Sequence, residues 1–371
     1  MNFEHTAERR ELREDVRAWC DDHRERIAEC DRKSEFPREL YREGMERGFG
    51  NVIIPERYGG EGGGAMEYAL VAEETGIFQI CFQVQRSLIA AGNDDQQERF
   101  LPGFASGDLV GAISISEPET GSSLKSMDTV AVREGDQYVL SGTKSHVNLA
   151  AEADLHKVYA MTEEGLTAFL VEDDNPGLTV SPKLDPIGTR YLPLYDVELD
   201  ECAVDADQVL MAPGDGYDVF FKTFNFSRIG NASEMLGHGK RALESAVEWA
   251  KEREVGDDHV TDFQGMRWKI AELATQLRAA ERIRDEAAWR IDNGDSGALE
   301  TSMAKLACAN AALPATTESI QITGATGLYR HQPYEAHFRN VKTLEVAGGS
   351  REIMKNVIAN ELIEGDTPLV L

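Results

Sequence analysis

Few residue patterns in this chain identify a chemistry by their spacing alone. A glycine-rich run follows Tyr58 and reads YGGEGGG, and glycine-rich loops can expose backbone N–H groups to a phosphate. The run has neither the GxGxxG spacing nor the Gly-Lys-Ser/Thr ending of phosphate loops, so we predict a turn. The cysteines are Cys20, Cys30, Cys81, Cys202 and Cys308. They are odd in number and contain no CxxC pair, which argues against a disulfide framework and against a zinc site.

The overall charge excludes some classes of partner. The 371 residues include 66 acidic and 38 basic ones, which give a net charge of −28. Such a surface repels the phosphate backbone, so we expect no nucleic-acid binding, and the acid spread along the chain predicts adaptation to high salt in a halophile. No apolar run is long enough to span a bilayer, and the charged N-terminus lacks a secretory signal. We therefore expect a cytoplasmic protein.

Hydrophobic periodicity divides the chain into a helical, a β and a second helical part. We predict an α+β multidomain fold with an N-terminal helical domain over 1–108, an antiparallel β domain over 109–215 and a C-terminal four-helix bundle over 216–371. The β-like runs are Leu109–Ser116, Thr129–Arg133, Gln137–Leu140, Val158–Met161, Leu166–Val171, Leu178–Ser181 and Leu194–Leu199.

Two long helices are expected in the C-terminal part, over about 263–293 and 297–323. The first would be roughly 45 Å long, and one small domain cannot bury a helix of that length. Helix faces should therefore remain for contact with another subunit.

Local strings occur in order along nearly the whole chain and resemble the acyl-CoA dehydrogenase family. They are Ile54–Gly60 (IPERYGG), Ile115–Ser122 (ISEPETGS), Ser141–Lys144 (SGTK), Ala250–Arg253 (AKER), Gln321–Gly324 (QITG) and Phe338–Asn340 (FRN). The strings Ala28–Arg32 (AECDR), with Pro37 after it, and Gly348–Ser350 (GGS) are similar to the crotonobetainyl-CoA reductase branch.

The resemblance implies an FAD-dependent dehydrogenase or enoyl-CoA reductase acting on a CoA thioester. In the family a carboxylate takes the α-proton while the β-hydrogen leaves as hydride to the flavin, and electrons pass to an electron-transfer flavoprotein. A homo- or hetero-tetramer, or a dimer, is implied. The cofactor-binding residues implied are Ile115, Ser116, Gly121, Ser122, His146, Asn148, Arg253, Gln264, Gln321, Gly324 and Ser350, some reaching a neighbouring subunit. Ser122 and Arg228 are implied for the substrate.

The catalytic carboxylate of the family is missing at both places where it is expected. The usual position, just before a Gly-Thr or Gly-Ser pair, is Gly348, and the alternative position, just before Arg228, is Ser227. A positioned general base contributes on the order of 10² to 10⁴ in rate. Glu234 lies two helical turns after Ser227 and Glu345 lies three residues before Gly348, and we treat each as a weak candidate for a replacement.

The residues implied around the flavin also depart from the family. His146 stands where a stacking Trp is usual, and Asn148 replaces a Thr. Arg-x-x-Phe-Gly becomes Arg253–Asp257 (REVGD), which removes an aromatic ring and adds acid near a diphosphate. These changes predict weaker flavin binding, or binding completed by another chain.

Three functions stay open at this point. The chain could be a complete acyl-CoA dehydrogenase or enoyl-CoA reductase with an unrecognised acid or base. It could be a structural or half-site subunit whose sister chain brings the carboxylate. A flavin monooxygenase on the same fold would not need that carboxylate. Because function depends on the site, the fold alone cannot separate them.

Overall fold

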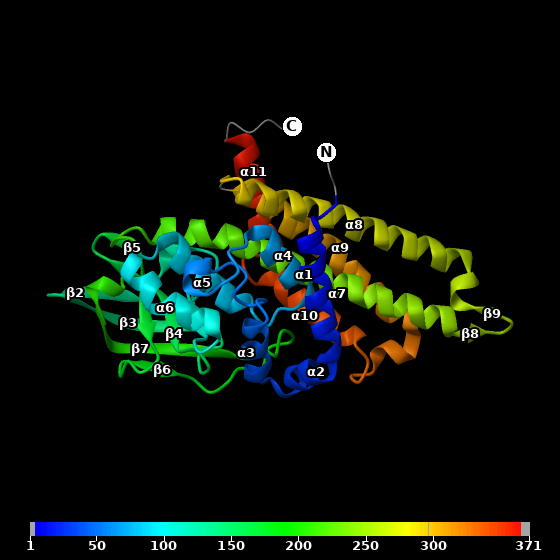
Figure 1. Cartoon of the computed structure of the whole chain (residues 1–371), viewed down its shortest axis with the longest axis horizontal. Coiled ribbons are helices and arrows are strands. Elements are labelled where there is room, and N and C mark those ends of the chain that lie inside the picture. Colours follow the sequence, from blue (N-terminus) through cyan, green and yellow to red (C-terminus); the bar gives the residue numbers. More distant parts are fainter. Residues whose placement is uncertain (1–3, 296, 365–371) are drawn as a thin grey trace.

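A computed structural model of the chain describes residues 4–295 and 297–364. The molecule is elongated, with a β-sheet at one end and long helices that run from it to the other end (Figure 1). The N-terminal helices lie across the junction of these two parts. Among the described helices, none combines the length and the apolar character needed to cross a bilayer.

The N-terminal part is helical, as predicted. Its helices are α1 (Ala7–Asp22), α2 (Arg24–Lys33), α3 (Arg38–Glu46), α4 (Ala65–Glu74), α5 (Gln79–Ala91) and α6 (Asp94–Ser106). Their apolar residues share one core, in which Trp19 is buried against Phe78. The glycine-rich run between α3 and α4 is a turn, because the N–H groups of Gly62 and Gly63 bond back to the carbonyls of Ile54 and Val52.

The middle part is a curled sheet in which each predicted β-run falls on a strand. The strands are β1 (Gly111–Ser114), β2 (Val130–Glu134), β3 (Gln137–Asn148), β4 (Leu155–Thr162), β5 (Gly165–Glu172), β6 (Leu178–Val180) and β7 (Leu194–Asp205). Their order is β1-β4-β2-β3-β7-β6, with β5 paired to β4.

The prediction of a wholly antiparallel sheet was wrong for two of its pairings. β1 pairs with β4 in parallel, and β2 meets β4 in parallel at one residue pair. A parallel pairing needs a crossover of roughly a dozen residues or more, and the β2–β3 hairpin lies between β1 and β4 in the chain and supplies it. The other pairings within this sheet are antiparallel.

The C-terminal part is a helical bundle arranged around α9. Its helices are α7 (Gly216–Glu252), α8 (Gln264–Asp292), α9 (Ala298–Thr323), α10 (Tyr334–Val346) and α11 (Arg351–Ile363), with the short hairpin β8 (Glu254–Val255) and β9 (Asp258–His259) after α7. The two predicted long helices are α8 and α9. Small buried residues let α7 and α9 approach closely, since a Cβ on Gly239 would lie 3.0 Å from Ala312. α11 packs on α9 outside the predicted four-helix core.

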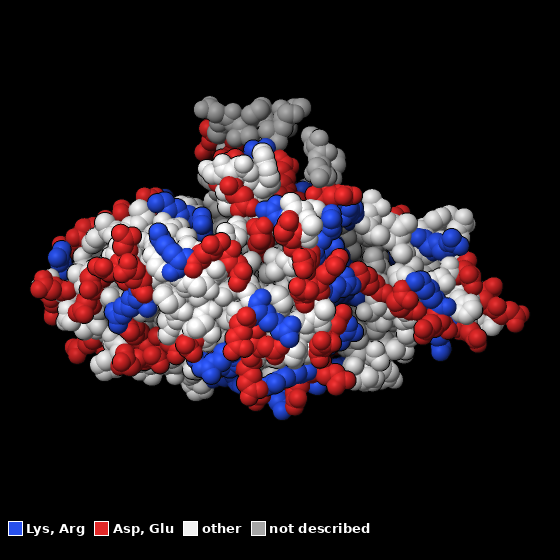
Figure 2. All heavy atoms as spheres, in the orientation of Figure 1, with Lys and Arg blue, Asp and Glu red and all other residues white. Residues whose placement is uncertain are grey.

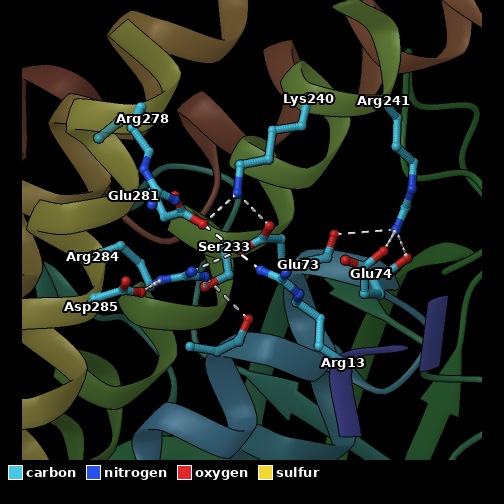
Figure 3. A network of polar contacts seen from close by, with 12 residues as sticks. Arg13, Glu73, Glu74, Ser233, Lys240, Arg241, Arg278, Glu281, Arg284 and Asp285 are labelled. Carbon is cyan, nitrogen blue, oxygen red and sulfur yellow. Dashed lines mark hydrogen bonds and ion pairs between the residues drawn. The ribbon is translucent and has the colours of Figure 1, made fainter. Parts of the chain in front are cut away.

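A network of buried charges fixes α4 of the N-terminal part against α7 and α8 (Figure 3). Arg284, on α8, is fully buried and its guanidinium lies 2.7 Å from the Glu73 carboxylate of α4. Lys240, on α7, bridges Glu73 at 2.6 Å and Glu281 at 2.7 Å. Arg284 also donates to the Ser233 hydroxyl at 2.8 Å. Three elements from distant parts of the sequence therefore share one ionic cluster.

The charges in this cluster compensate one another. Burial alone would raise the pKa of Glu73, but the positive charges of Arg284 and Lys240 outweigh it and lower that pKa to about 2. A carboxylate whose pKa is lowered stabilises the folded state at pH values above its ordinary pKa of 4.5. This stabilisation is lost as the pH falls toward 2. Arg241 makes a second link, at 2.5 Å to Glu74.

Removing Arg284 should destabilise the whole protein. We expect Arg284→Met to lower the free energy of unfolding by about 3–5 kcal/mol, because Glu73 would remain buried with part of its compensation lost. Urea denaturation measures this change. The matched control is Arg17→Met, since Arg17 pairs with Glu244 on the surface and such pairs contribute less than about 1 kcal/mol. Equal effects of the two substitutions would contradict the role given to the cluster.

Candidate functional site

The two positions that lack a carboxylate converge on one spot in the structure. Ser227 lies on α7, and Gly348 lies in the turn between α10 and α11 with a φ of +67°. Asn231 follows Ser227 by one helical turn, and its amide nitrogen occupies the place where a Cβ on Gly348 would lie. A base from either position would therefore act at the same place, which lies between α7 and the turn at 347–349.

A chain of buried hydrogen bonds fixes the Asn231 amide. The Tyr68 hydroxyl donates to Gln79 Oε1 at 2.9 Å, and Gln79 Nε2 donates to Asn231 Oδ1 at 3.0 Å. Because Oδ1 accepts from Gln79, the amide nitrogen of Asn231 is the atom turned toward Gly348. Tyr68 is held in turn by stacking on Phe226, with ring centroids 4.6 Å apart.

Two buried cations border the same spot. Lys305, on α9, donates to the carbonyls of Ala347 and Gly349 and so holds the turn in place. Burial and the nearby positive charge of Arg228 lower the pKa of the Lys305 ammonium to about 7. Arg228 donates to Asn225 Oδ1 at 2.9 Å and to the Ser302 hydroxyl at 3.1 Å. Burial lowers its pKa to about 10.

Glu234 is the nearby carboxyl whose environment suits proton transfer. Its side chain is buried, and Oε1 accepts a 2.6 Å hydrogen bond from the Tyr191 hydroxyl. Oε2 has no hydrogen-bond partner within the described chain. Burial raises the pKa of Glu234 to about 7, although the bond from Tyr191 opposes this. Gly76 makes room for the carboxyl, because a Cβ there would overlap Oε1.

Glu345, the other weak candidate, is held in ion pairs. Its carboxylate lies 2.8 Å from Lys342 and 2.7 Å from Arg351. Burial would raise its pKa, but these two cations lower it below the ordinary value. A carboxylate so stabilised in its charged form is a weak proton acceptor. The geometry therefore favours Glu234 over Glu345.

The residues expected at the ring end of a flavin lie together at the ends of β1 and β3. The Ser116 carbonyl follows Ile115 and accepts from the Ser145 N–H at 2.8 Å, which brings the two strand ends side by side. His146 is exposed and has a φ of +59°. Asn148 donates from its amide to the Leu192 carbonyl at 2.9 Å.

Gly121 and Ser122 are exposed in the loop that follows β1. A buried ion pair of 2.8 Å between Glu117 and Lys144 anchors the start of that loop. Glu117 also accepts the backbone N–H of Thr129 at 2.9 Å. The loop is thus fixed at its base, while its tip stays open.

The residues expected at the adenine end do not meet the ring end within one chain. They are Arg253, Gln264, Gln321 and Gly324, and they lie around the β8–β9 hairpin and the end of α9, far from the sheet (Figure 1). Arg253, Gln264 and Gln321 are exposed, and no atom lies within 4 Å of a Cβ placed on Gly324. Ser350 lies elsewhere, as the N-cap of α11, where its side chain accepts from the Ile353 N–H.

The chemistry of these groups fits a flavin dinucleotide. β1 ends the strand order of the sheet, so one edge of it has backbone groups without a strand partner. The Ser114 hydroxyl, at the end of β1, is buried and has no hydrogen-bond partner among residues 4–295 and 297–364. Amide, hydroxyl and backbone groups suit the polar edge of a flavin ring, and the open backbone at Gly324 suits a diphosphate.

Sequence reasoning missed three residues of this site. Asn231 could have been found, because it lies four residues after Ser227 and therefore on the same helix face. Lys305 interrupts an alanine-rich stretch of α9, which is an unusual place for a charge. Tyr191 gave no signal, since its contact with Glu234 joins a loop of the β part to α7.

Comparisons with known proteins define the class. Residues 6–108, 112–202 and 214–363 match the N-terminal, middle and C-terminal domains of acyl-CoA dehydrogenases. The short-chain specific acyl-CoA dehydrogenase of Homo sapiens is 33% identical over 353 residues, which cover 91% of this chain and 85% of the relative. The chain belongs to the acyl-CoA dehydrogenase family. As such it is an FAD-dependent oxidoreductase that acts on CH–CH bonds of acyl-CoA thioesters.

Solved structures agree with this assignment. The butyryl-CoA dehydrogenase of Megasphaera elsdenii has a TM-score of 0.93 at 27% identity, covering 98% of this chain and 100% of that one. A structure described as the electron transferring flavoprotein of Acidaminococcus fermentans has a TM-score of 0.94 at 28% identity, with 98% and 100% covered.

A side chain at position 348 should conflict with Asn231. We expect Gly348→Ala to lower the free energy of unfolding through two contributions. The left-handed φ should cost about 1–2 kcal/mol, and the overlap with Asn231 should cost about 1–3 kcal/mol more. In an Asn231→Ala background only the first part should remain, as measured by urea denaturation of the double-mutant cycle. Gly135→Ala is the control, because Gly135 has a φ of +64° and open space around it. An additive cycle would show that the two positions do not compete.

Proposed function

We propose that this chain catalyses its own redox reaction on the α,β-carbons of a CoA thioester, with Glu234 as the group that takes or returns the α-proton. The observation that carries the proposal is the buried Glu234 carboxyl, which has one oxygen without a partner in the described chain and a pKa raised to about 7 by burial. A proton acceptor works best when its pKa lies near the working pH. The direction of reaction, oxidation or reduction, follows from the substrate supplied.

A short path of contacts supports the placement of Glu234. Tyr191 bonds to Glu234, and the next residue, Leu192, accepts from Asn148 at the expected flavin end. The segment from 189 to 192 is itself fixed, because the Thr189 N–H donates to Asn340 Oδ1 at 2.7 Å. Glu234 is therefore held in a defined relation to the strand ends.

When bound, FAD would supply the acceptor for the β-hydrogen as hydride. Ile115, Ser116, His146 and Asn148 would hold the ring end. Arg253, Gln264, Gln321 and Gly324 would hold the adenine end from a second copy of the chain, which agrees with their distance from the sheet and their exposure. Ser122 and Arg228 remain the proposed substrate contacts.

The purified chain should be yellow and should bleach with acyl-CoA thioesters under anaerobic conditions. We expect Glu234→Gln to slow bleaching by about 10²–10⁴, because the amide cannot accept the proton. Glu345→Gln is the control and should leave the rate nearly unchanged. Visible absorbance and stopped-flow traces give both results. An unchanged rate in Glu234→Gln would rule out Glu234 as the proton acceptor.

The pH dependence follows from the same group. Dehydrogenation requires the carboxylate form, so its rate should rise as the pH rises through about 7, and the reverse reduction should fall over the same range. Glu234→Gln should remove this inflection.

A catalytically incomplete subunit is the second candidate. The specific observation in its favour is that the Asn231 amide fills the place of a side chain at Gly348. A colourless protein, or a yellow one that bleaches with no thioester, would support this reading. A flavin monooxygenase, the third hypothesis, has no specific contact in its favour and would require a reductase and oxygen.

Partners follow from the family and from exposed apolar surface. We propose an electron-transfer flavoprotein as redox partner, which the structural neighbour from Acidaminococcus fermentans supports. We propose a dimer or tetramer, because Trp268 and Trp289 of α8 are 60% and 58% exposed. The assignment of the chain to the crotonobetainyl-CoA reductase branch of the family remains a prediction.

Domain limits and location are proposals of the same kind. We keep limits at 1–108, 109–215 and 216–371, supported by α6 ending at Ser106, β1 beginning at Gly111 and α7 beginning at Gly216. A cytoplasmic location is supported by the cysteines, which are all free, with four of the five buried.

We also propose adaptation to high salt. Acidic side chains are spread across the visible face from the sheet end to the hairpin end, with fewer basic ones among them and other residues between (Figure 2). At low salt these charges repel one another, and salt screens the repulsion. We therefore expect the thermal midpoint to rise steeply as potassium chloride is raised into the molar range. Differential scanning fluorimetry measures this, and a midpoint that does not change with salt would contradict the proposal.

A further inference from the structure

Arg228 is a buried cation without a carboxylate beside it. Its side chain is 4% exposed, and its guanidinium donates only to neutral groups, Asn225 and Ser302, among the described residues. The Nε atom is buried with no hydrogen-bond partner in the part of the chain that the structure describes. An arginine does not relieve this by losing its proton, because even the pKa of about 10 to which burial lowers Arg228 lies well above neutral pH.

Lys305 adds a second buried cation at the same place. It is 1% exposed, and it donates to two backbone carbonyls rather than to a carboxylate. Glu345 is the acidic group that acts on it, but Glu345 is already paired with Lys342 and Arg351. The turn at 347–349 is thus bordered by N–H donors from α7 and α9 whose charge is not compensated.

Other buried cations of this protein are treated differently. Arg284 lies against Glu73 and Asp285, and Lys144 lies against Glu117. Lys157 is buried beside the Ser87 hydroxyl, and like Lys305 it can become neutral, since burial lowers the pKa of each lysine to about 7. Arg228 differs from both lysines because it keeps its charge. Leaving an arginine unpaired in the interior is costly, and Arg284, the other arginine classed as buried in the described part of the chain, is paired with Glu73.

We propose that Arg228 and Lys305 form a binding site for one carboxylate group of a ligand. The free Nε edge of a guanidinium presents parallel N–H groups that match the two oxygens of a carboxylate. Lys305 contributes a second charge, and the Asn231 amide nitrogen beside Gly348 contributes a neutral donor. Gly348 has no side chain to cover the turn. This inference rests on the proposed function, because it specifies the substrate class of the same site.

Two sources of the carboxylate share this chemistry. It could be the acid end of the acyl group in a dicarboxylic CoA thioester, which would make such thioesters the preferred substrates. It could also be a small free carboxylate that binds beside the thioester. The two sources differ in whether the carboxylate is attached to CoA, and binding experiments can separate them.

The first experiment uses thermal melting of the full chain at constant ionic strength in potassium chloride, with chloride replaced in part by acetate or glutarate. We expect the carboxylates to raise the midpoint of the wild type by about 3 °C or more at saturating concentration. Arg228→Met should not respond, and without carboxylate it should melt at or above the wild type, since it removes an unpaired charge. The proposal would be overturned if Arg228→Met melted well below the wild type and the wild type showed no response to carboxylates.

The second experiment compares the binding of glutaryl-CoA and pentanoyl-CoA, which have the same chain length and differ in the terminal carboxylate. If the acyl group supplies the carboxylate, glutaryl-CoA should bind at least tenfold more tightly, and Arg228→Gln should abolish the difference. Equal binding of the two, with a midpoint raised by acetate, would assign the site to a free carboxylate. Equal binding with no response to acetate or glutarate would refute the site.

These measurements stay informative if the proposed reaction fails. Both read binding or melting and need no turnover, so an inactive chain can still show the carboxylate site. Conversely, Glu234→Gln should leave both results unchanged, because Glu234 bonds to Tyr191 and not to Arg228 or Lys305. If Arg228→Met does not fold, Arg228→Lys keeps a charge but loses the two-pronged geometry, and it should weaken the response.

Discussion

The buried contact between Arg284 and Glu73 fixes the helices that position the rest of the site. It joins α4 to α8, and Lys240 of α7 closes the cluster. Because α4 is held there, Tyr68 of the same helix reaches Gln79, and Gln79 reaches Asn231 of α7. The polar groups around Gly348 are therefore linked, through α4, to the salt-bridge cluster.

The two kinds of buried charge in this protein have different consequences. In the cluster each charged group lies beside a group of opposite charge, so interactions within the chain offset the free-energy cost of desolvation. At Glu234 and Arg228 this cost is not offset, because one carboxyl oxygen and one guanidinium nitrogen have no partner among the described residues. Groups of this kind destabilise the folded state, and proteins keep them mainly where a ligand or a proton completes them.

Much of the fold followed from the sequence, because each strand and long helix shows its own local period. The run at 263–293 became α8 and the run at 297–323 became α9 with almost the same limits. The parallel pairing of β1 was missed, since pairing partners leave no local signal. In the site, Glu234 could be named as a candidate from helical spacing, but Tyr191 could not, because only the folded chain brings its loop to α7. Burial decided between Glu234 and Glu345, and the burial of a polar residue cannot be predicted from the residues next to it in the sequence.

The pairing of Gly348 with Asn231 argues that the missing carboxylate is part of a built arrangement. A glutamate at position 348 would have to adopt a left-handed φ and displace an amide that Gln79 holds in place. Restoring the side chain would therefore require at least two changes, at 348 and at 231. A site that had merely lost one residue would keep room for it. Here the space is filled by a donor, beside two cations, and this environment favours a negatively charged group that arrives from outside the chain. Any proton taken from a substrate must then be accepted elsewhere, which is the reason Glu234 and the carboxylate site belong to one argument.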